Sequence, residues 1–563
     1  MSEASPVARA TMPDAMRRVA EAGRGRLSFH REGESVSLSV TELYERALAR
    51  AAQLIGAGVA RGDTVGLIGS NAPEWVEWAW ATWLAGAALV PLPAPVRLRD
   101  PAAFARQVES LLGATSCTTV VGEPRYLAAL DADGRVQLAW DAEPIGILAA
   151  VPAELSPLET AVVMCTSGST AEPKGIRVSH GMLVARSGGA AALLGLADGE
   201  LPPVVSWLPF YHAGGLATVA SLAVEALDSH VLSVQRFAKD PAEWLRLVSR
   251  TRALATAGPS SGWAAAVRAL ARRPEGVDLS CLRVAAFALE LVDAEVVDRL
   301  LEVCGPLGLR PEAIATAYGL SESGGGTFTR PGGGAHIDII DLDELASSGL
   351  AMPPRPGAPS KRAVSCGFPT PGFEIRVGFP SNPLPDRHVG ELFLRSEMNT
   401  DGYVNATSEG LFTEGWLRTG DLGYMADGEL FVTGRSKEIV VHLGRNYHPQ
   451  DIEGAVMRAT GVPPGSCIAF SPVTGREGDL VVIIEEMADR DAERLAATAH
   501  GAVVNAIGIV PREILVVAPG TIPTAHNGKV QRLIAREMHD RGAFLQNASG
   551  SIALSETTVA SEV

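Results

Sequence analysis

The sequence is poor in positive charge and in cysteine. Its 563 residues include 48 Lys and Arg against 64 Asp and Glu, a formal net charge of −16, whereas a nucleic-acid surface needs a basic patch. Only six cysteines are present, and none of them form a CxxC pair. We therefore expect no nucleic-acid partner and no zinc site, and we predict reduced thiols in a cytoplasmic protein.

Apolar runs long enough to predict a membrane span are also missing. The N-terminal segment has no apolar core typical of a signal peptide. The uncharged stretch 78–96 approaches the length of a span, but Pro91, Pro93 and Pro95 interrupt it. We predict instead a helix over 72–90 that is buried on all sides, because its tryptophans occupy more than one face.

Several well-known catalytic motifs are absent. A Walker A loop requires GxxxxGK[ST], but Pro173 precedes Lys174 and Gly175 follows it. The sequence contains no HExxH, and no GxGxxG follows a predicted strand. The segment 319–323 lacks the last glycine of a GxSxG nucleophile elbow. These absences argue against a P-loop enzyme, a Rossmann dehydrogenase and a serine hydrolase.

The order of the remaining segments predicts an α/β protein with more than one domain. A chain of this length favours two or more domains. Its first half alternates helical and strand-like stretches, which predicts layered α/β subdomains with largely parallel sheets. From about residue 391 the pattern becomes β-rich. We predict a large N-terminal domain over 1–435, a small mobile α+β domain over 436–545 and a disordered tail over 546–563.

Glycine and proline mark an insertion in the N-terminal domain at about 323–366. GGGTFTRPGGG opens this segment, MPPRPGAPSKR closes it, and HIDIIDLDELASSGL lies between them. Such punctuation indicates an excursion from the main fold. Disorder and a packed insertion remain equally open.

The stretch 166–175, TSGSTAEPKG, has the composition of a phosphate-binding loop. Gly168 permits close approach of the backbone to a ligand, and Lys174 adds a mobile positive charge. The hydroxyl donors are Thr166, Ser167, Ser169 and Thr170. Backbone amides of such a loop can form an anion-binding nest. By itself, the same composition also fits a polar surface loop.

This loop is the first of five motifs that resemble those of the adenylate-forming superfamily, which includes acyl-CoA synthetases, luciferases, adenylation domains and fatty acyl-AMP ligases. The motifs are TSGSTAEPKG at 166–175, WLPFYHAGGL at 207–216, AYGLSESG at 317–324, TGDLGYMADGELFVTGRSKEIVV at 419–441 and PTAHNGKVQR at 523–532. The resemblance spans about residues 30–540. It implies an enzyme that uses ATP and Mg²⁺ to adenylate a carboxylic acid and release pyrophosphate.

The resemblance assigns a nucleotide-binding role to several positions. The loop at 166–175, with Lys174, would bind the β- and γ-phosphates. Tyr318 resembles the tyrosine that stacks on adenine, and Gly319 follows it. Asp421, helped by Arg435, would bind the ribose hydroxyls.

Other matching positions would act on the metal ion and the reacting groups. Glu322 resembles the carboxylate that binds Mg²⁺, together with Thr166. Ser321 and His212 would lie near the α-phosphate, and His212 also near the acyl carboxylate. Lys529 resembles the lysine that bridges the carboxylate substrate and the α-phosphate.

Lys437 occupies the hinge position, where the small domain would swing.

The chemistry of adenylation suits the residue types of these candidates. A carboxylate attacks the α-phosphorus and pyrophosphate leaves, so two anions must meet and cations offset their repulsion. This reaction needs no nucleophilic side chain.

Three features resemble fatty acyl-AMP ligases more than acyl-CoA synthetases. They are GRNYHPQDIE at 444–453, the insertion followed by VSCG at 364–367, and PLP at 91–93 followed by DPAAF at 100–104. In such ligases the insertion restrains the small domain, and the acyl group passes to the phosphopantetheine of an acyl carrier protein. An acyl-CoA synthetase, an amino-acid adenylating enzyme and a non-catalytic homologue remain as alternatives.

Three departures from the family pattern stand out. Ala171 replaces the usual glycine of the phosphate loop, and the segment 213–215 lacks the usual aspartate after the histidine. FALEL at 287–291 replaces an NGAEP-like segment. Because Phe287 and Leu289 are bulkier and more apolar, we expect a reshaped or shortened acyl pocket for a medium-chain or unusual carboxylic acid.

Overall fold

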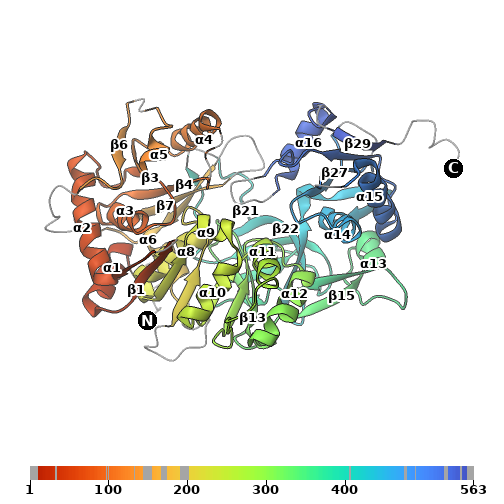
Figure 1. The fold of residues 1–563 in the computed structure, drawn as a ribbon, viewed down its shortest axis with the longest axis horizontal. Coiled ribbons are helices and arrows are strands. Elements are labelled where there is room, and N and C mark those ends of the chain that lie inside the picture. Colours follow the sequence, from red (N-terminus) through yellow and green to blue (C-terminus); the bar gives the residue numbers. More distant parts are fainter. Residues whose placement is uncertain are drawn as a thin grey trace. The chain divides into compact units, whose positions relative to one another are not determined.

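The computed structural model describes two compact units of the chain (Figure 1). The described residues are 10–31, 34–96, 98, 100–131, 134–143, 155–166, 174–189, 202–404, 407–473, 478–487, 490–524, 530–545 and 548–553. The first unit comprises Met1–His336, Cys366–Ile375 and Leu394–Leu417, and the second comprises Ile337–Ser365, Arg376–Phe393 and Arg418–Val563.

A seven-stranded sheet lies in the first unit. Its strands follow the order β20 (Tyr403–Val404), β8 (Lys174–Ser179), β7 (Thr160–Thr166), β4 (Ala88–Leu92), β3 (Thr64–Ile68), β5 (Thr119–Gly122) and β6 (Val136–Ala139). The pairings from β7 to β6 are parallel, while β7–β8 and β8–β20 are antiparallel. In register, Thr166 lies opposite Lys174, so both ends of the predicted phosphate loop meet at one edge of the sheet.

Apolar helices cover this part of the first unit. They are α1 (Met12–Ala22), α2 (Val40–Gly56), α3 (Pro73–Leu84), α4 (Pro101–Ala114), α5 (Pro124–Leu127), α6 (His180–Ser187) and α8 (Ala213–Glu225). The four tryptophans of α3 are completely buried, as expected for a helix apolar on every face. The predicted helix over 72–90 is wrong at its end, because the chain turns at Gly86, with φ +77°, and then forms β4.

The second sheet of the first unit has nine strands. Their order is β17 (Phe368–Pro369), β14 (Gly326–Phe328), β13 (Ile314–Gly319), β12 (Val284–Phe287), β11 (Ala255–Gly258), β9 (Pro203–Ser206), β10 (Asp228–Leu232), β1 (Arg26–Arg31) and β2 (Glu34–Ser39). The strands from β13 to β1 are parallel. Their carboxyl ends therefore share one edge of the sheet, where ligands bind in open α/β sheets.

Helices and short turns connect the strands of this sheet. They are α9 (Val234–Lys239), α10 (Ala242–Thr251), α11 (Ser260–Leu270), α12 (Ala294–Cys304) and the 3₁₀ turns η2 (Gly305–Leu307) and η3 (Pro311–Ala313). β21 (Phe412–Thr413) also belongs to the first unit, and β18 (Glu374–Val377), β19 (Gly390–Arg395) and β22 (Trp416–Ala426) contain the residues where the chain passes between units. The mixed α/β layers confirm the predicted fold class.

The second unit contains most of the inserted segment and the C-terminal elements. Its strands include the pairs β15 (Ile337–Asp341) with β16 (Ser360–Val364), β22 with β23 (Glu429–Arg435), and β24 (Val440–His442) with β25 (Arg445–Tyr447). A four-stranded sheet has the order β26 (Cys467–Phe470), β27 (Val481–Glu485), β28 (Glu513–Val517) and β29 (Ala548–Ala553). The helices are α13 (Leu342–Ser348), α14 (Pro449–Thr460), α15 (Ala492–Ile507), α16 (Arg532–Asp540) and the turn η4 (Ser436–Glu438).

The structure bears on two of the expectations for this unit. The insertion is packed, because β15 and β16 form an antiparallel pair connected through α13. The expected disordered tail is wrong for Ala548–Ala553, which pairs with β28 as an edge strand. The small polar residues of this segment bury little apolar surface to offset the loss of conformational entropy. Its backbone hydrogen bonds to β28 offset that loss instead. The domain boundary at residue 436 stays a prediction.

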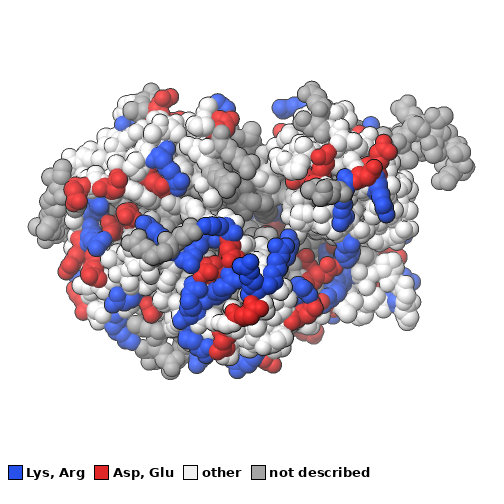
Figure 2. Space-filling model, viewed as in Figure 1, with Lys and Arg blue, Asp and Glu red and all other residues white. Residues whose placement is uncertain are grey.

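Charged side chains of both signs are interspersed on the face that Figure 2 shows. In the first unit, Arg236, Arg246 and Arg250 all pair with Glu243.

Within the described ranges, no helix combines the length and apolar character needed to cross a membrane.

Candidate functional site

The β7–β8 hairpin positions the first predicted phosphate-binding residues. Thr166 ends β7 and Lys174 begins β8. The ammonium nitrogen of Lys174 lies 5.1 Å from the ring centroid of Tyr403, a residue of the neighbouring strand β20. The predicted loop residues Ser167, Gly168, Ser169 and Thr170, together with Ala171, lie outside the described residues.

A tight turn after β13 presents the next predicted residues. Tyr318 and Gly319 end the strand. The Gly324 amide donates to the Leu320 carbonyl at 2.7 Å, which closes a turn that contains Ser321 and Glu322. The buried hydroxyl of Ser323 donates to the Gly325 carbonyl at 2.6 Å and secures the same turn from inside.

Tyr403 links this turn to the β7–β8 hairpin. Its hydroxyl makes a hydrogen bond with the Glu322 carboxylate, and burial followed by this negative charge raises the pKa of Tyr403 to about 12. The phenol therefore stays protonated and can donate to the carboxylate. Lys174 and Glu322, which are far apart in the sequence, thus both contact one tyrosine.

Arg186, in the last helical turn of α6, stabilises the turn that contains Ser321 and Glu322. Its guanidinium donates to the carbonyls of Ser321 at 3.2 Å, Glu322 at 3.0 Å and Met398 at 2.6 and 3.0 Å. Burial lowers the pKa of Arg186 to about 10, while the nearby Glu322 carboxylate opposes this shift. The group is thus still a cation at neutral pH, and it bonds both residues that the family pattern assigns to the metal and the α-phosphate.

The turn is shaped around this arginine. Gly324 has φ +69°, and a β-carbon built on it would lie 2.1 Å from Cδ of Arg186. Both features require glycine at this position. The Thr400 amide also donates to the Glu322 carbonyl at 2.7 Å, and the Thr400 hydroxyl donates to the Arg177 carbonyl of β8 at 2.6 Å. The Glu322 backbone is therefore fixed by contacts from two other segments.

His212 lies at the start of α8, where the chain leaves β9. It is the residue immediately before the helix, its amide donates to the Pro209 carbonyl at 3.0 Å, and its carbonyl accepts from Leu216 at 2.8 Å. The side chain is half-buried. The FALEL segment follows β12 at the same edge of the sheet, and the side chain of Leu289 contacts Gly214 of α8.

The second unit contains the remaining described candidates. Asp421 and Arg435 are register partners on β22 and β23, and Nε of Arg435 donates to the Asp421 carboxylate at 3.0 Å. The Asp421 side chain is only 8% exposed, and its amide donates to the Thr419 hydroxyl at 3.0 Å. Lys437 lies exposed in η4. Lys529 is outside the described residues.

Sequence reasoning missed Arg186 and Tyr403. Tyr403 follows a Thr-Asp-Gly turn, and Arg186 is the one cation in the helical stretch HGMLVARS. An arginine inside an otherwise apolar and small helical stretch is a signal, because guanidinium groups are rarely buried without a specific partner. Nothing in the sequence indicates that the partners are carbonyls more than a hundred residues away.

Comparisons with known proteins identify the family of the chain. The family model of the AMP-binding enzyme matches residues 16–404. The chain is 31% identical over 519 residues to the 4-hydroxyphenylalkanoate adenylyltransferase of Mycobacterium tuberculosis, covering 85% of this chain and 82% of that protein. It is 26% identical over 550 residues to JamA, a medium-chain-fatty-acid–acyl-carrier-protein ligase of Moorena producens, covering 92% of each.

A solved structure from a study of fatty acyl-adenylate ligases of E. coli and L. pneumophila is also similar. It matches with a TM-score of 0.84 and 26% identity, covering 96% of this chain and 99% of that one. The fold, the motif order and the matched span all lead to one assignment. The chain belongs to the family of AMP-binding enzymes and is an ATP-using ligase of the class that adenylates carboxylic acids.

Proposed function

We propose that this enzyme converts a fatty or related carboxylic acid to its acyl adenylate with ATP and Mg²⁺, and then transfers the acyl group to the phosphopantetheine thiol of an acyl carrier protein. The observation that supports the first step most directly is the contact series Lys174–Tyr403–Glu322, whose last residue is held through its carbonyl by Arg186. This series connects Lys174, the cation that would bind phosphate, to Glu322, the carboxylate that would bind a metal ion.

The donor set fits a nucleotide and its metal ion. Mg²⁺ in nucleotide sites is held by one or two carboxylates together with phosphate oxygens and waters, and Glu322, with the Thr166 hydroxyl, would supply the protein ligands. When bound, Mg²⁺ neutralises negative charge on the phosphates. The hairpin loop and Lys174 would hold the phosphates that leave as pyrophosphate.

The nucleoside and the reacting groups would be held by the remaining candidates. Tyr318 would stack on the adenine, and the Asp421 carboxylate, oriented by Arg435, would accept hydrogen bonds from the ribose hydroxyls. His212 would orient the acid carboxylate, and Lys529 would neutralise charge where the carboxylate meets the α-phosphate. Removing one such electrostatic donor typically costs ~3–4 kcal/mol of barrier.

Contacts between the insertion and α14 support a carrier protein as the acyl acceptor. The ammonium nitrogen of Lys361, on β16 of the insertion, lies 2.7 Å from a carboxylate oxygen of Asp451 on α14, and both side chains are largely buried. Arg445 pairs with Asp343 of α13 at 3.4 Å. Asp451 and Arg445 belong to the GRNYHPQDIE stretch that resembles fatty acyl-AMP ligases.

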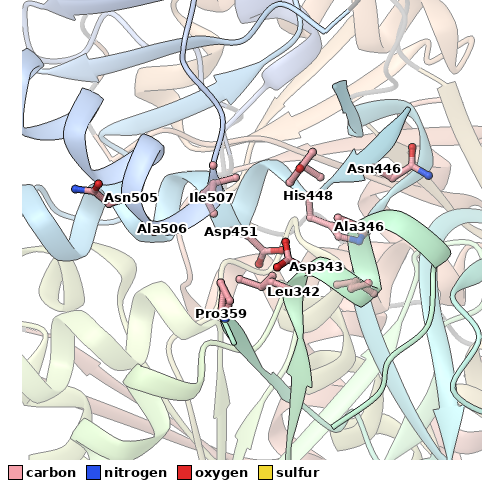
Figure 3. Close-up of a pocket in the computed structure, with 13 residues that line it drawn as sticks. Leu342, Asp343, Ala346, Pro359, Asn446, His448, Asp451, Asn505, Ala506 and Ile507 are labelled. Atoms are coloured by element: carbon pink, nitrogen blue, oxygen red, sulfur yellow. The ribbon is translucent and has the colours of Figure 1, made fainter. Parts of the chain in front are cut away.

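A cavity lies along the same contact (Figure 3). It measures about 230 Å³ and is lined from α13 by Leu342 and Asp343 and from α14 by Asp451. The insertion thus touches the C-terminal elements through ion pairs beside a partly filled gap. Such a contact would restrain the movement of the small domain that a CoA-dependent enzyme requires. JamA, whose name gives it a carrier protein as acceptor, supports the same choice.

The test has two parts. ATP–pyrophosphate exchange with a panel of carboxylic acids measures adenylation, and no exchange with any acid would refute the first step. Acyl transfer is then measured in parallel to free CoA and to a pantetheinylated carrier protein. We expect thioester on the carrier protein only; efficient thioester formation on CoA would instead identify an acyl-CoA synthetase.

A further inference from the structure

Leu289 combines two features that a loop leucine rarely shows together. Its φ is +78°, a backbone conformation that is strained for any residue with a branched side chain. Its side chain is 41% exposed although it is apolar. Neither the backbone energy nor hydration favours leucine here, so its side chain is expected to serve a purpose other than folding.

Four hydrogen bonds hold the segment around Leu289. The Ala288 amide donates to the Gly258 carbonyl at 3.1 Å. The Ser261 amide and hydroxyl both donate to the Glu290 carboxylate. The hydroxyl of Ser260 donates to the Leu291 carbonyl at 3.2 Å. The strained backbone conformation is thus fixed on both sides of Leu289.

The Leu289 side chain lies against the start of α8. A β-carbon built on Gly214 would lie 3.2 Å from both methyl carbons of Leu289 and 3.0 Å from Cδ1 of Leu208. Gly214 is two residues after His212, within the first turn of the helix. The isobutyl group of Leu289 therefore lies against the helix turn that begins at His212.

The interior behind this segment is filled by aromatic rings. Phe287 is completely buried and stacks on Trp263 with 5.4 Å between ring centroids. Trp263 lies 4.2 Å from Trp244, and Trp207 stacks on Phe237 at 3.6 Å. The segment that carries Leu289 therefore rests on a packed interior, and packed interiors do not yield without loss of contact energy.

We propose that Leu289 sets the acid specificity of the enzyme by narrowing the space beside His212, so that compact apolar acids, of medium chain length at most, are preferred to long ones. This inference rests on the proposed adenylating function and on the role of His212 in it. The isobutyl group offers apolar contact to the first methylene groups of the acid. The packed rings behind Phe287 keep the segment that carries Leu289 from yielding to a longer chain.

The experiment compares wild type with Leu289→Ala, Leu289→Gly and a matched control. Pyrophosphate release is measured with butanoate, octanoate, dodecanoate and hexadecanoate, and kcat and KM are determined separately. Leu384→Ala is the control, because Leu384 is also a leucine, 39% exposed, that packs on glycines, Gly378 and Gly390. Leu289→Gly also relieves the positive φ, which offsets part of the conformational entropy that glycine adds to the unfolded chain.

Wild type should prefer butanoate or octanoate over hexadecanoate. Both Leu289 variants should raise kcat/KM for the two longer acids about tenfold, mainly through KM, since a few methylene groups of pocket space are worth factors of this size. Leu384→Ala should leave the profile unchanged. A wild-type preference for hexadecanoate, or Leu289 variants with the wild-type profile, would overturn the inference while leaving adenylation intact. Inactivity of wild type with every carboxylic acid would instead refute the proposed function itself.

Discussion

Replacement of Arg186 by methionine tests whether its half-buried guanidinium holds the turn of Ser321 and Glu322 in place. Methionine retains much of the length of the side chain but provides no donor and no charge. The carbonyls of Ser321, Glu322 and Met398 would lose the donors that they have at 2.6–3.2 Å. The turn that carries Glu322 would then rest on its own internal bonds, the contact from Thr400 and the hydrogen bond between Tyr403 and the Glu322 carboxylate.

The expected loss of stability follows from the number of carbonyls left without a donor. A buried acceptor that loses its partner costs ~1–3 kcal/mol, and bonds from a charged donor lie at the upper end. The sum over three such carbonyls is an upper limit for the loss in free energy of unfolding. Relaxation of the turn and entry of water would reduce this loss, because some of the carbonyls can turn toward solvent. We therefore expect the free energy of unfolding to fall by about 3–5 kcal/mol, as for other broken buried charge networks.

The expected loss of activity follows from the position of Glu322. A displacement of about 1 Å in a group that binds the reacting complex can cost roughly 10²-fold in rate. We expect kcat for ATP–pyrophosphate exchange to fall by about that factor in Arg186→Met. Arg186→Lys retains the charge and a rotatable set of donors, so it should recover part of the rate but not the planar, three-way geometry.

Two measurements and one control separate the possible outcomes. Urea unfolding gives stability, and exchange kinetics at saturating ATP give kcat. Arg395→Met is the control, because Arg395 is 50% exposed and bonds Glu374 at the surface; its loss should cost under ~1 kcal/mol. Wild-type kcat in a destabilised Arg186→Met would refute the positioning role, and wild-type stability would refute the energetic argument as well.

Four further predictions concern other residues. Lys529→Ala should abolish adenylation while equilibrium dialysis still detects ATP binding; unchanged acyl-AMP formation would contradict its role. Asp421→Ala should raise KM for ATP about tenfold or more, since a hydrogen bond between a charged group and the ribose contributes ~1.5–3 kcal/mol. Lys361→Ala leaves the buried Asp451 carboxylate without its cation and should raise acyl transfer to CoA; no gain over wild type would count against the insertion as a restraint. Burial lowers the pKa of His448 to about 4, so the unfolded state binds more protons below about pH 6.5, and stability should fall by about 2 kcal/mol between pH 7 and pH 5. His448→Gln should flatten this dependence in urea unfolding measured at both pH values.

The motifs could be found from the sequence because each is local. A phosphate loop, a turn with Ser321 and Glu322, and the strand pair with Asp421 and Arg435 are each built within a few residues of their own motif, so residue types and spacing carry the information. The α/β layering was equally accessible, since apolar periodicity reports burial. The helix predicted over 72–90 failed at Gly86, where a left-handed turn begins a strand whose residues are as apolar as the helix before it.

Contacts between segments that are distant in the sequence could not be predicted from residue types and spacing. Arg186 and the Glu322 carbonyl are 136 residues apart, and no local pattern relates a helical arginine to the backbone of a later turn. Tyr403 joins Lys174 to Glu322 only because β20 pairs with β8. Edge pairing also ordered Ala548–Ala553, whose own composition favoured disorder.

The sequence by itself determined the family, the order of the motifs and the chemical types available to bind ATP, because these depend on residue identity and short spacing. The tertiary structure alone decided what supports those motifs: a half-buried arginine that bonds the carbonyls of the turn at 321–322, a tyrosine that contacts Lys174 and Glu322, and a strained leucine against the first turn of α8. The physical reason is that hydrogen bonds, burial and steric contact act over a few ångströms in space, whatever the separation along the chain.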